Sequence, residues 1–269
     1  MSGLLQIMIR LCAAFSALFL FSCTVKEDRG GCPCHLVVDM SRVLDTETTH
    51  PSLWNDGLKL SILTQGSFAA GSDYKYGEVP LELEYSVSRG EATVFAVMGV
   101  ERGQVSGSSY MLPEGADPDP LFAFSRSVDC SGEEALVTLG MFKQFARVTV
   151  LGLDSLDTRL VVAAPFAGLD LTTCSALPGK LRFPLEKDED GAYRFRLPRQ
   201  GDDSVSILMY EADGQPEGSL PLGKYLKEAG YDWGAESLSD LSVTIDRMSV
   251  SVSISIEGWN NSFESPITI

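Results

Sequence analysis

Residues 248–257 read Met-Ser-Val-Ser-Val-Ser-Ile-Ser-Ile-Glu, and their five apolar side chains alternate strictly with serine. This alternation is typical of a β-strand that buries one face and exposes the other. Many other short apolar segments occur along the chain, with Gly, Pro and Asp between them. We therefore predict a mainly all-β protein, with further strands at residues 35–39, 58–64, 81–87, 93–100, 135–139, 146–151, 159–163, 181–185, 193–197, 205–210 and 241–245.

Short strands joined by such turns are typical of β-sandwiches with Greek-key connections. Asp190-Gly191 lies between predicted strands at residues 181–187 and 192–197, so we expect a tight hairpin there. Pro184 would confine its strand to a sheet edge, because proline donates no ladder hydrogen bond. The acids in residues 188–191 also suggest calcium ligands, but the bidentate acid of a full binding loop does not follow, which favours a turn.

One helix is predicted, at residues 221–229, where Pro221 suits the first turn and Gly230 suits the end. The segment just before it, residues 218–224, has the glycine and lysine spacing of a phosphate-binding loop. Tyr225 stands where Ser or Thr would hold magnesium, and Pro221 removes one of the cradling amides. We interpret the segment as a loop that opens the helix.

The N-terminus has the pattern of a bacterial lipoprotein signal peptide. Arg10 precedes an apolar run at residues 11–21, which is shorter than the roughly twenty residues of a membrane-spanning helix. The small residue Ser22 stands before Cys23, as a lipoprotein signal peptidase requires. We expect residues 1–22 to be removed and lipid on Cys23 to anchor the protein outside the cytoplasm. Translation could begin at Met1 or at Met8.

The charged residues of the chain bear on its export and on what it can bind. Lys26, Glu27 and Asp28 resemble the Lys and acidic pair that follows the lipid cysteine in surface-exported lipoproteins of the Bacteroidetes; the alternative is a solvated linker. The net charge of −16 argues against binding nucleic acid or anionic lipid headgroups. The lipid, rather than a basic patch, would therefore hold the protein to its membrane.

Four cysteines remain apart from Cys12 in the signal and the lipobox Cys23: Cys32, Cys34, Cys130 and Cys174. An exported compartment permits disulfides, but four cysteines allow three sets of pairings and the sequence does not choose among them. The chain has only two histidines, which disfavours a metal site. We expect these cysteines to be structural, and we expect no metal or cofactor.

Catalytic motifs are absent from the sequence, which contains neither Gly-x-Ser-x-Gly nor His-Glu-x-x-His. Glu82 and Glu84 share one face of a predicted strand and could act as a carboxylate pair, but an acidic chain produces such pairs by chance. We therefore predict a non-catalytic protein. The tryptophans would suit sugar binding if exposed, although core packing is the expected role of Trp54, Trp233 and Trp259.

Three segments carry a family resemblance. Cys23 and the charged run at residues 26–29, followed by Cys-Pro-Cys-His-Leu-Val-Val-Asp at residues 32–39, resemble the start of the FimB-type fimbrillin-associated anchor lipoproteins of Bacteroidales type V pili. Residues 143–150 are similar to the opening strand of that family's second domain. The end of the chain is also similar, at residues 221–226, 241–246 and 253–259.

The resemblance implies two transthyretin-like β-sandwich domains, and a change of strand set between Gly140 and Arg147 places the boundary. We predict a signal peptide at residues 1–22, a lipidated linker at 23–34, and domains at 35–140 and 141–269. The implied function is a surface-exposed anchor subunit of a pilus, held in the outer membrane by Cys23. It would bind the stalk subunit, fimbrillin, by β-strand addition and end assembly.

In this family's pili, stalk subunits lose an N-terminal strand before they polymerise, and an anchor that keeps its own strand has no open groove. Here residues 248–256 are the candidate core strand, and residues 263–269 are the candidate partner-facing tail, with Phe263, Ile267 and Ile269 as its apolar side chains. The tail could equally cover its own sheet edge. Alternative functions are a surface glycan-binding lipoprotein and a tip or accessory pilus subunit.

Overall fold

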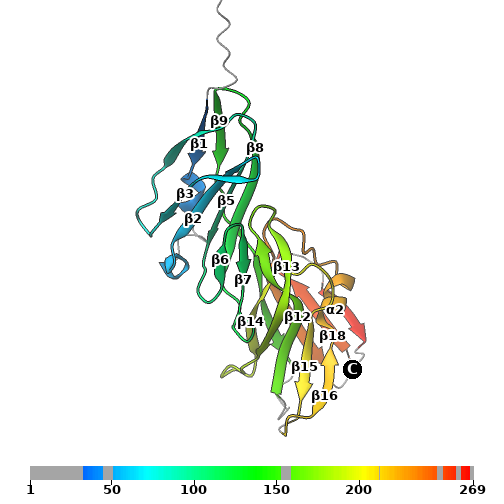
Figure 1. The fold of residues 1–269 in the computed structure, drawn as a ribbon. Helices are drawn as coiled ribbons and strands as arrows, with labels where there is room; N and C mark the ends of the chain where they lie inside the picture. The colour runs from blue at the N-terminus through cyan, green and yellow to red at the C-terminus, as the bar shows by residue number, and fades with distance from the viewer. Residues whose placement is uncertain are drawn as a thin grey trace, which may run out of the picture.

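The computed structural model describes residues 33–44, 51–152, 159–211, 213–246, 251–258 and 262–266. These residues form two β-sandwiches placed end to end in an elongated molecule (Figure 1). The prediction of a mainly all-β fold with one short helix is confirmed.

The first sandwich packs a three-stranded sheet, β4-β1-β9, on a five-stranded sheet, β10-β8-β5-β2-β3. Its core contains Leu36, Leu60 and Phe124, each at most 2% exposed. The elements are β1 (Cys34–Asp39), η2 (Ser41–Leu44), η3 (Pro51–Trp54), β2 (Leu58–Thr64), β3 (Ser67–Tyr74), β4 (Glu82–Val87), β5 (Glu91–Met98), β8 (Phe122–Asp129), β9 (Glu134–Thr138) and β10 (Phe142–Lys143).

The second sandwich packs the sheet β14-β11-β17-β18-β19 on the sheet β16-β15-β12-β7-β6, with β13 along the other side of β12. Val148, Ile207 and Val243 lie in its core and are at most 1% exposed. The elements are β6 (Gln104–Ser106), β7 (Ser109–Met111), β11 (Phe145–Leu151), β12 (Arg159–Asp170), β13 (Ser175–Pro184), β14 (Tyr193–Pro198), β15 (Ser206–Tyr210), β16 (Pro216–Leu220), α2 (Leu222–Glu228), β17 (Leu241–Asp246), β18 (Ser251–Ile256) and β19 (Ser262–Pro266).

Both sandwiches begin with the same arrangement of strands. β1 pairs antiparallel with β4 and parallel with β9, and β11 pairs antiparallel with β14 and parallel with β17. The first strand of each sandwich is therefore enclosed by a neighbour on each side. In the second sandwich this sheet continues beyond β17 into β18 and β19, whereas in the first sandwich it ends at β9.

The chain also enters the second sandwich before it completes the first. The β6–β7 hairpin follows β5 in sequence but pairs with β12, with Ser109 opposite Asp170 and Met111 opposite Gly168. The chain then returns to the first sandwich through β8. Two backbone crossings therefore join the sandwiches before residue 140, where the sequence suggested a boundary.

The local predictions have mixed outcomes. The helix is confirmed as α2, with Pro221 as its N-cap and Gly230 just beyond its end at a φ of 82°. The predicted hairpin around Asp190-Gly191 forms only as a tight turn closed by one antiparallel bridge, between Lys187 and Tyr193. β13 pairs with β12 and β14 pairs with β11, so the two flanking strands belong to different sheets. Pro184 does end an edge strand, as predicted.

Candidate functional site

β1 fills the middle of the first sandwich's smaller sheet. Leu36 lies opposite Tyr85 of β4 and Ala135 of β9, so both edges of the strand are paired. Its inward side chains, Cys34, Leu36 and Val38, are 0% exposed. This position, between one antiparallel and one parallel neighbour, is therefore already occupied by the chain's own N-terminal strand.

Polar contacts secure the far end of β1. The Asp39 carbonyl accepts the Leu139 amide at 2.8 Å, and the Asp39 carboxylate accepts the Thr138 hydroxyl at 3.1 Å. The Ser41 amide donates to the same carboxylate at 2.9 Å. These hydrogen bonds, that of the Ser41 amide first, lower the pKa of Asp39 below its usual value, because they favour the charged form.

The other terminal strand lies at the outer edge of the second sandwich. β19 pairs antiparallel with β18, and the half-buried Phe263 lies opposite Ile254. The Tyr225 hydroxyl of α2 donates to the Pro266 carbonyl at 3.3 Å. Among the described strands, none pairs with the other side of β19. A proline within this strand suits an edge position.

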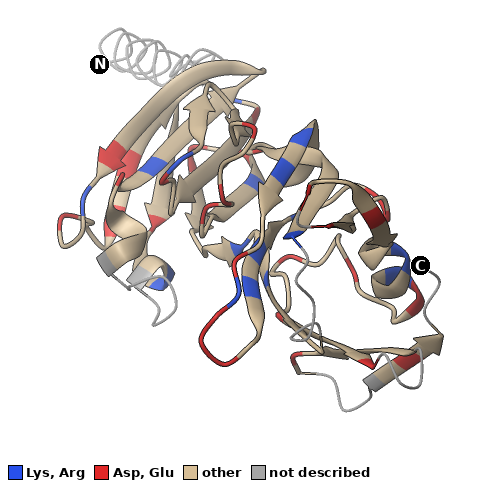
Figure 2. Cartoon of the chain, turned by 90° about the horizontal axis from the view of Figure 1, so that it is seen from below, with Lys and Arg blue, Asp and Glu red and all other residues tan. Residues whose placement is uncertain are grey.

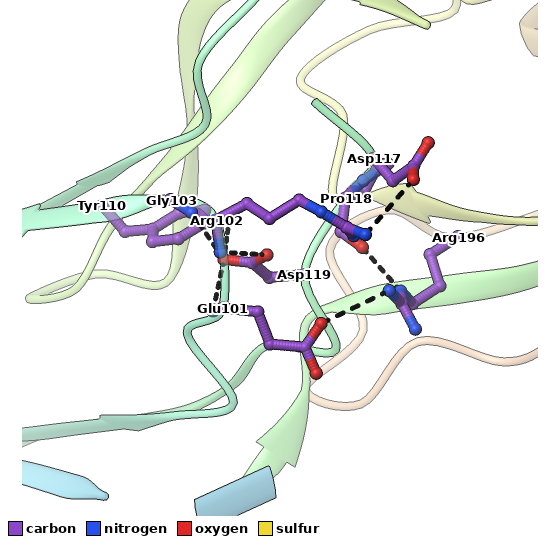
Figure 3. A network of polar contacts seen from close by, with 8 residues as sticks. All are labelled: Glu101, Arg102, Gly103, Tyr110, Asp117, Pro118, Asp119 and Arg196. Atoms are coloured by element: carbon purple, nitrogen blue, oxygen red, sulfur yellow. Dashed lines mark hydrogen bonds and ion pairs between the residues drawn. The ribbon is translucent and has the colours of Figure 1, made fainter. Parts of the chain in front are cut away.

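Between the two terminal strands, a buried carboxylate organises the domain junction. Asp119 is 2% exposed and accepts hydrogen bonds from the backbone amides of Glu101 at 3.0 Å, Arg102 at 2.9 Å and Gly103 at 2.9 Å (Figure 3). The Tyr110 hydroxyl donates to it as well, at 2.9 Å. Burial, and then the Asp119 charge, raise the pKa of Tyr110 above its usual value, so the phenol remains a donor.

Arg196 of β14 ties the second sandwich to this network. Its side chain donates to the Pro118 carbonyl and lies 3.8 Å from the Glu101 carboxylate (Figure 3). The segment at residues 113–120 is therefore a surface loop only in its first part, because Pro118, Asp119 and Pro120 are buried.

A second set of contacts surrounds the chain as it passes into β11. Lys143 is 8% exposed and its ammonium lies 2.9 Å from the Asp240 carboxylate, which also accepts the Arg147 amide at 2.7 Å. The buried Arg199 guanidinium donates to the Gln144 side chain at 2.9 Å and to the Ala235 carbonyl at 2.7 Å. Burial lowers the pKa of Arg199, and electrostatic interactions with Cys174, Tyr231 and Asp232 partly oppose this shift.

A groove of about 1060 Å³ lies between these networks, lined by residues of both sandwiches. Acidic residues are spread over both sandwiches, and basic residues gather where the sandwiches meet (Figure 2). Each basic residue that lines the groove lies within 3.8 Å of a carboxylate: Arg102, Lys143, Arg147, Arg194 and Arg196. The basic side chains that line the groove are therefore all paired, so it offers no unpaired cation to an anionic ligand.

Several predicted site residues lie outside the described residues: Cys23, Lys26, Glu27, Asp28, Cys32, Ile267, Ile269 and Trp259. Cys34 and Cys130 lie in the core of the first sandwich, whereas Cys174 is half-buried in the second. Trp54 is 5% exposed, and Trp233 packs edge-on against Tyr231 with ring centroids 4.7 Å apart. The two described tryptophans therefore form no exposed aromatic platform.

The candidate calcium ligands are engaged by a side chain instead. Arg194 lies 2.6 Å from the Asp188 carboxylate and 2.5 Å from that of Asp190. Its hydrogen bond to Asp190 lowers the pKa of that carboxyl to about 2. Within the described ranges, no group of three or more His, Cys, Asp or Glu residues is arranged to hold a metal ion. Nor does this part of the chain contain a helix long and apolar enough to cross a membrane.

The described residues thus form two sandwiches, in which the first described strand is enclosed and the last described strand lies at a sheet edge. No known protein family and no curated protein matches the sequence. Among solved structures, it is similar to the fimbrial anchor protein Mfa2 from Porphyromonas gingivalis, with a TM-score of 0.59, 12% identity, and coverage of 85% of this chain and 98% of that chain.

Two further structures share the fold. One is described as a candidate polysaccharide-binding protein from Bacteroides thetaiotaomicron, with a TM-score of 0.60, 15% identity, and coverage of 87% of this chain and 98% of that chain. The other is described as a candidate adhesin from Bacteroides ovatus, with a TM-score of 0.57, 12% identity, and coverage of 86% and 95%. At these identities the similarity establishes the fold, which is the one that the family resemblance implied.

Replacing Asp119 with alanine should destabilise the junction. The substitution leaves three backbone amides in a buried site without their acceptor, which costs about 1–3 kcal/mol for each group that water cannot reach. We expect the free energy of unfolding to fall by at least about 2 kcal/mol in chemical denaturation. The control is Asp117→Ala, which removes only an exposed pair with Arg102 and should change stability by less than about 0.5 kcal/mol. Equal effects of the two substitutions would contradict this role of Asp119.

Proposed function

We propose that this protein is the anchor subunit of a type V pilus, attached to the outer membrane by lipid on Cys23 and exposed at the cell surface. The observation that carries the proposal is the place of β1, which pairs with β4 and β9 at the same time. In fibres built by strand addition, a subunit accepts a neighbour's strand only where its own sheet has an open position. A first sandwich whose first strand stays in place offers no such position, and so the fibre would end at that sandwich.

The opposite end of the molecule supplies the proposed contact with fimbrillin. β19 leaves one edge of its sheet without a neighbour among the described strands, and such an edge presents backbone donors and acceptors to a partner. Strand addition at this edge would provide affinity through backbone hydrogen bonds and specificity through alternate side chains. Phe263, together with Ile267 and Ile269, would supply the apolar side chains.

The similar fold of Mfa2, itself named a fimbrial anchor protein, supports a role in fimbriae. Fold alone does not determine function, so the resemblance of residues 23–39 to anchor lipoproteins is the second support. A glycan-binding role has less support, because Trp54 is buried and the described tryptophans form no exposed aromatic platform. A tip or accessory subunit would share the fold but would not need lipid at Cys23.

Deleting residues 263–269 should abolish co-purification of fimbrillin with the protein. The deletion removes the edge strand and its apolar side chains but leaves β18 paired with β17. The measurement is crosslinked pull-down from outer membranes, followed by mass spectrometry. The control is Leu136→Ser on β9, the edge strand of the other sandwich, where Leu136 is 67% exposed. We expect this control to retain fimbrillin; unchanged recovery of fimbrillin with the deletion would refute the assignment to β19.

Replacing Cys23 with alanine should release fimbriae into the medium. Without the cysteine no lipid can be attached, and the net charge of −16 argues against binding to anionic headgroups. The measurement is the fraction of fimbrillin in the cell-free supernatant, with Cys12→Ala in the signal segment as the control that keeps fimbriae on cells. Fimbriae that stay cell-bound in the Cys23→Ala strain would argue against an anchor and for a tip or accessory subunit.

A further inference from the structure

Cys34 and Cys130 meet at one end of the first sandwich. Cys34 is the first residue of β1, and Cys130 directly follows β8, so the two residues come from opposite sheets. Both residues are free cysteines at 0% exposure, and their thiols lie close enough to interact. The two cysteines are about a hundred residues apart in the sequence, so the fold alone brings them together.

Backbone hydrogen bonds hold both cysteines in place. The Cys130 amide donates to the Gly90 carbonyl at 2.7 Å, between β4 and β5. The His35 amide donates to the Glu133 carbonyl at 2.8 Å, and Cys34 lies opposite Val87 of β4. The connections β4–β5 and β8–β9 therefore converge on the start of β1, and they leave little freedom for the two thiols to separate.

We propose that Cys34 and Cys130 form a disulfide in the exported protein, and that this bond locks β1 into its sheet. The inference rests on the proposed function for the oxidising compartment and for the importance of a retained β1. The two Sγ–H bonds break and a bond forms between the sulfur atoms, while the two protons and two electrons released convert the disulfide of a thiol oxidoreductase to a dithiol. Exported compartments supply oxidants of this class.

The other cysteines fit this pairing less well. Cys174 packs against the core of the second sandwich, whereas Cys34 and Cys130 belong to the core of the first. Cys32 lies outside the described residues, and it is separated from Cys34 by a single proline, which makes a bond within that pair strained. The alternative to test is therefore a bond from Cys130 to Cys32.

The environment also determines when the bond forms. Burial, together with the neighbouring Cys34, raises the pKa of Cys130 to about 11, so little reactive thiolate exists in the folded protein. Oxidation must then occur while the chain folds, before the core closes. Once formed, the bond is inaccessible to reductants in the folded protein, because both sulfur atoms are buried.

The bond would change how tension passes through an anchor. A pull from the membrane enters the sandwich at the start of β1, where hydrogen bonds to β4 and β9 alone would resist it. With the disulfide, the same pull also reaches β8 in the opposite sheet through a covalent bond. The strand that is proposed to end the fibre then cannot leave its position.

The pairing is tested on the full chain recovered from outer membranes. Free thiols are alkylated in denaturant before reduction, and linked peptides are identified by mass spectrometry. Trypsin leaves Cys32 and Cys34 in one peptide, between Arg29 and Arg42, so single variants are needed. We expect the link to Cys130 in the wild type and in Cys32→Ser, and its loss in Cys34→Ser. A link that survives in Cys34→Ser, or a Cys130 that is fully alkylated in the wild type, overturns the proposal.

The locking effect has its own measurement. A bond that closes a loop of this length should raise Tm by about 10 °C, so Cys34→Ser/Cys130→Ser should melt lower than Cys32→Ser by that amount. In the Cys34→Ser/Cys130→Ser variant, the backbone amides of β1 should also exchange hydrogen faster, while the exchange rates of the β11 amides in the second sandwich should not change. If the double variant fails to fold, the wild type refolded in reductant provides the comparison.

Equal melting and equal exchange would refute the lock. These results do not depend on fimbrillin. A linked protein that binds no fimbrillin would refute the anchor function alone, whereas an unlinked protein that retains fimbrillin would refute the disulfide alone.

Discussion

The first sandwich depends on one strand of six residues, β1, which forms backbone ladders with β4 on one side and β9 on the other. Detaching β1 would expose Leu36 and Val38, whose burial contributes about 1.5–3 kcal/mol each. It would also leave one edge of β4 and one edge of β9 unpaired. A domain is typically stable by only about 5–15 kcal/mol, so the sandwich needs either this strand or a substitute of the same kind. That dependence makes a strand-exchange fibre possible, and it also allows a subunit that keeps its strand to end one.

Tension can pass between β1 and β19 only if the two sandwiches are firmly joined to each other. The β6–β7 hairpin pairs with β12 in the second sandwich. The Asp119 carboxylate accepts hydrogen bonds from three backbone amides at residues 101–103, between β5 and β6. Arg196 then joins that segment to β14. Buried charged groups with satisfied partners resist rearrangement, because breaking one partner leaves the other uncompensated. Tension applied at β19 would therefore pass through hydrogen-bonded strands and a fixed junction to β1, and from there to the N-terminal linker.

Local patterns in the sequence were sufficient for much of this fold. Strict alternation predicted β18, and proline and glycine marked the ends of α2. β3 and β8 were not predicted, because Ser-Phe-Ala-Ala-Gly-Ser-Asp-Tyr and Phe-Ala-Phe-Ser-Arg-Ser-Val-Asp lack the usual strand composition and form through pairing with β2 and β5.

Contacts between distant residues could not be predicted from local patterns. The turn at Gly191 was predicted, but its flanking strands pair with distant strands in different sheets. No local pattern singled out Asp119, since its amide partners lie 16 to 18 residues away. Enclosure of β1 between β4 and β9 likewise depends on residues far apart in sequence.

The central claim is that the protein works in the fibre with its first strand still in place. Its most direct test is the intact mass of the protein recovered with fimbriae from outer membranes. We expect a chain that begins at lipidated Cys23 and still contains residues 34–39, paired within its own sandwich. A fimbria-bound chain that begins after Arg42, and so lacks β1, would contradict the account, because the sheet would then have an open position like that of a stalk subunit.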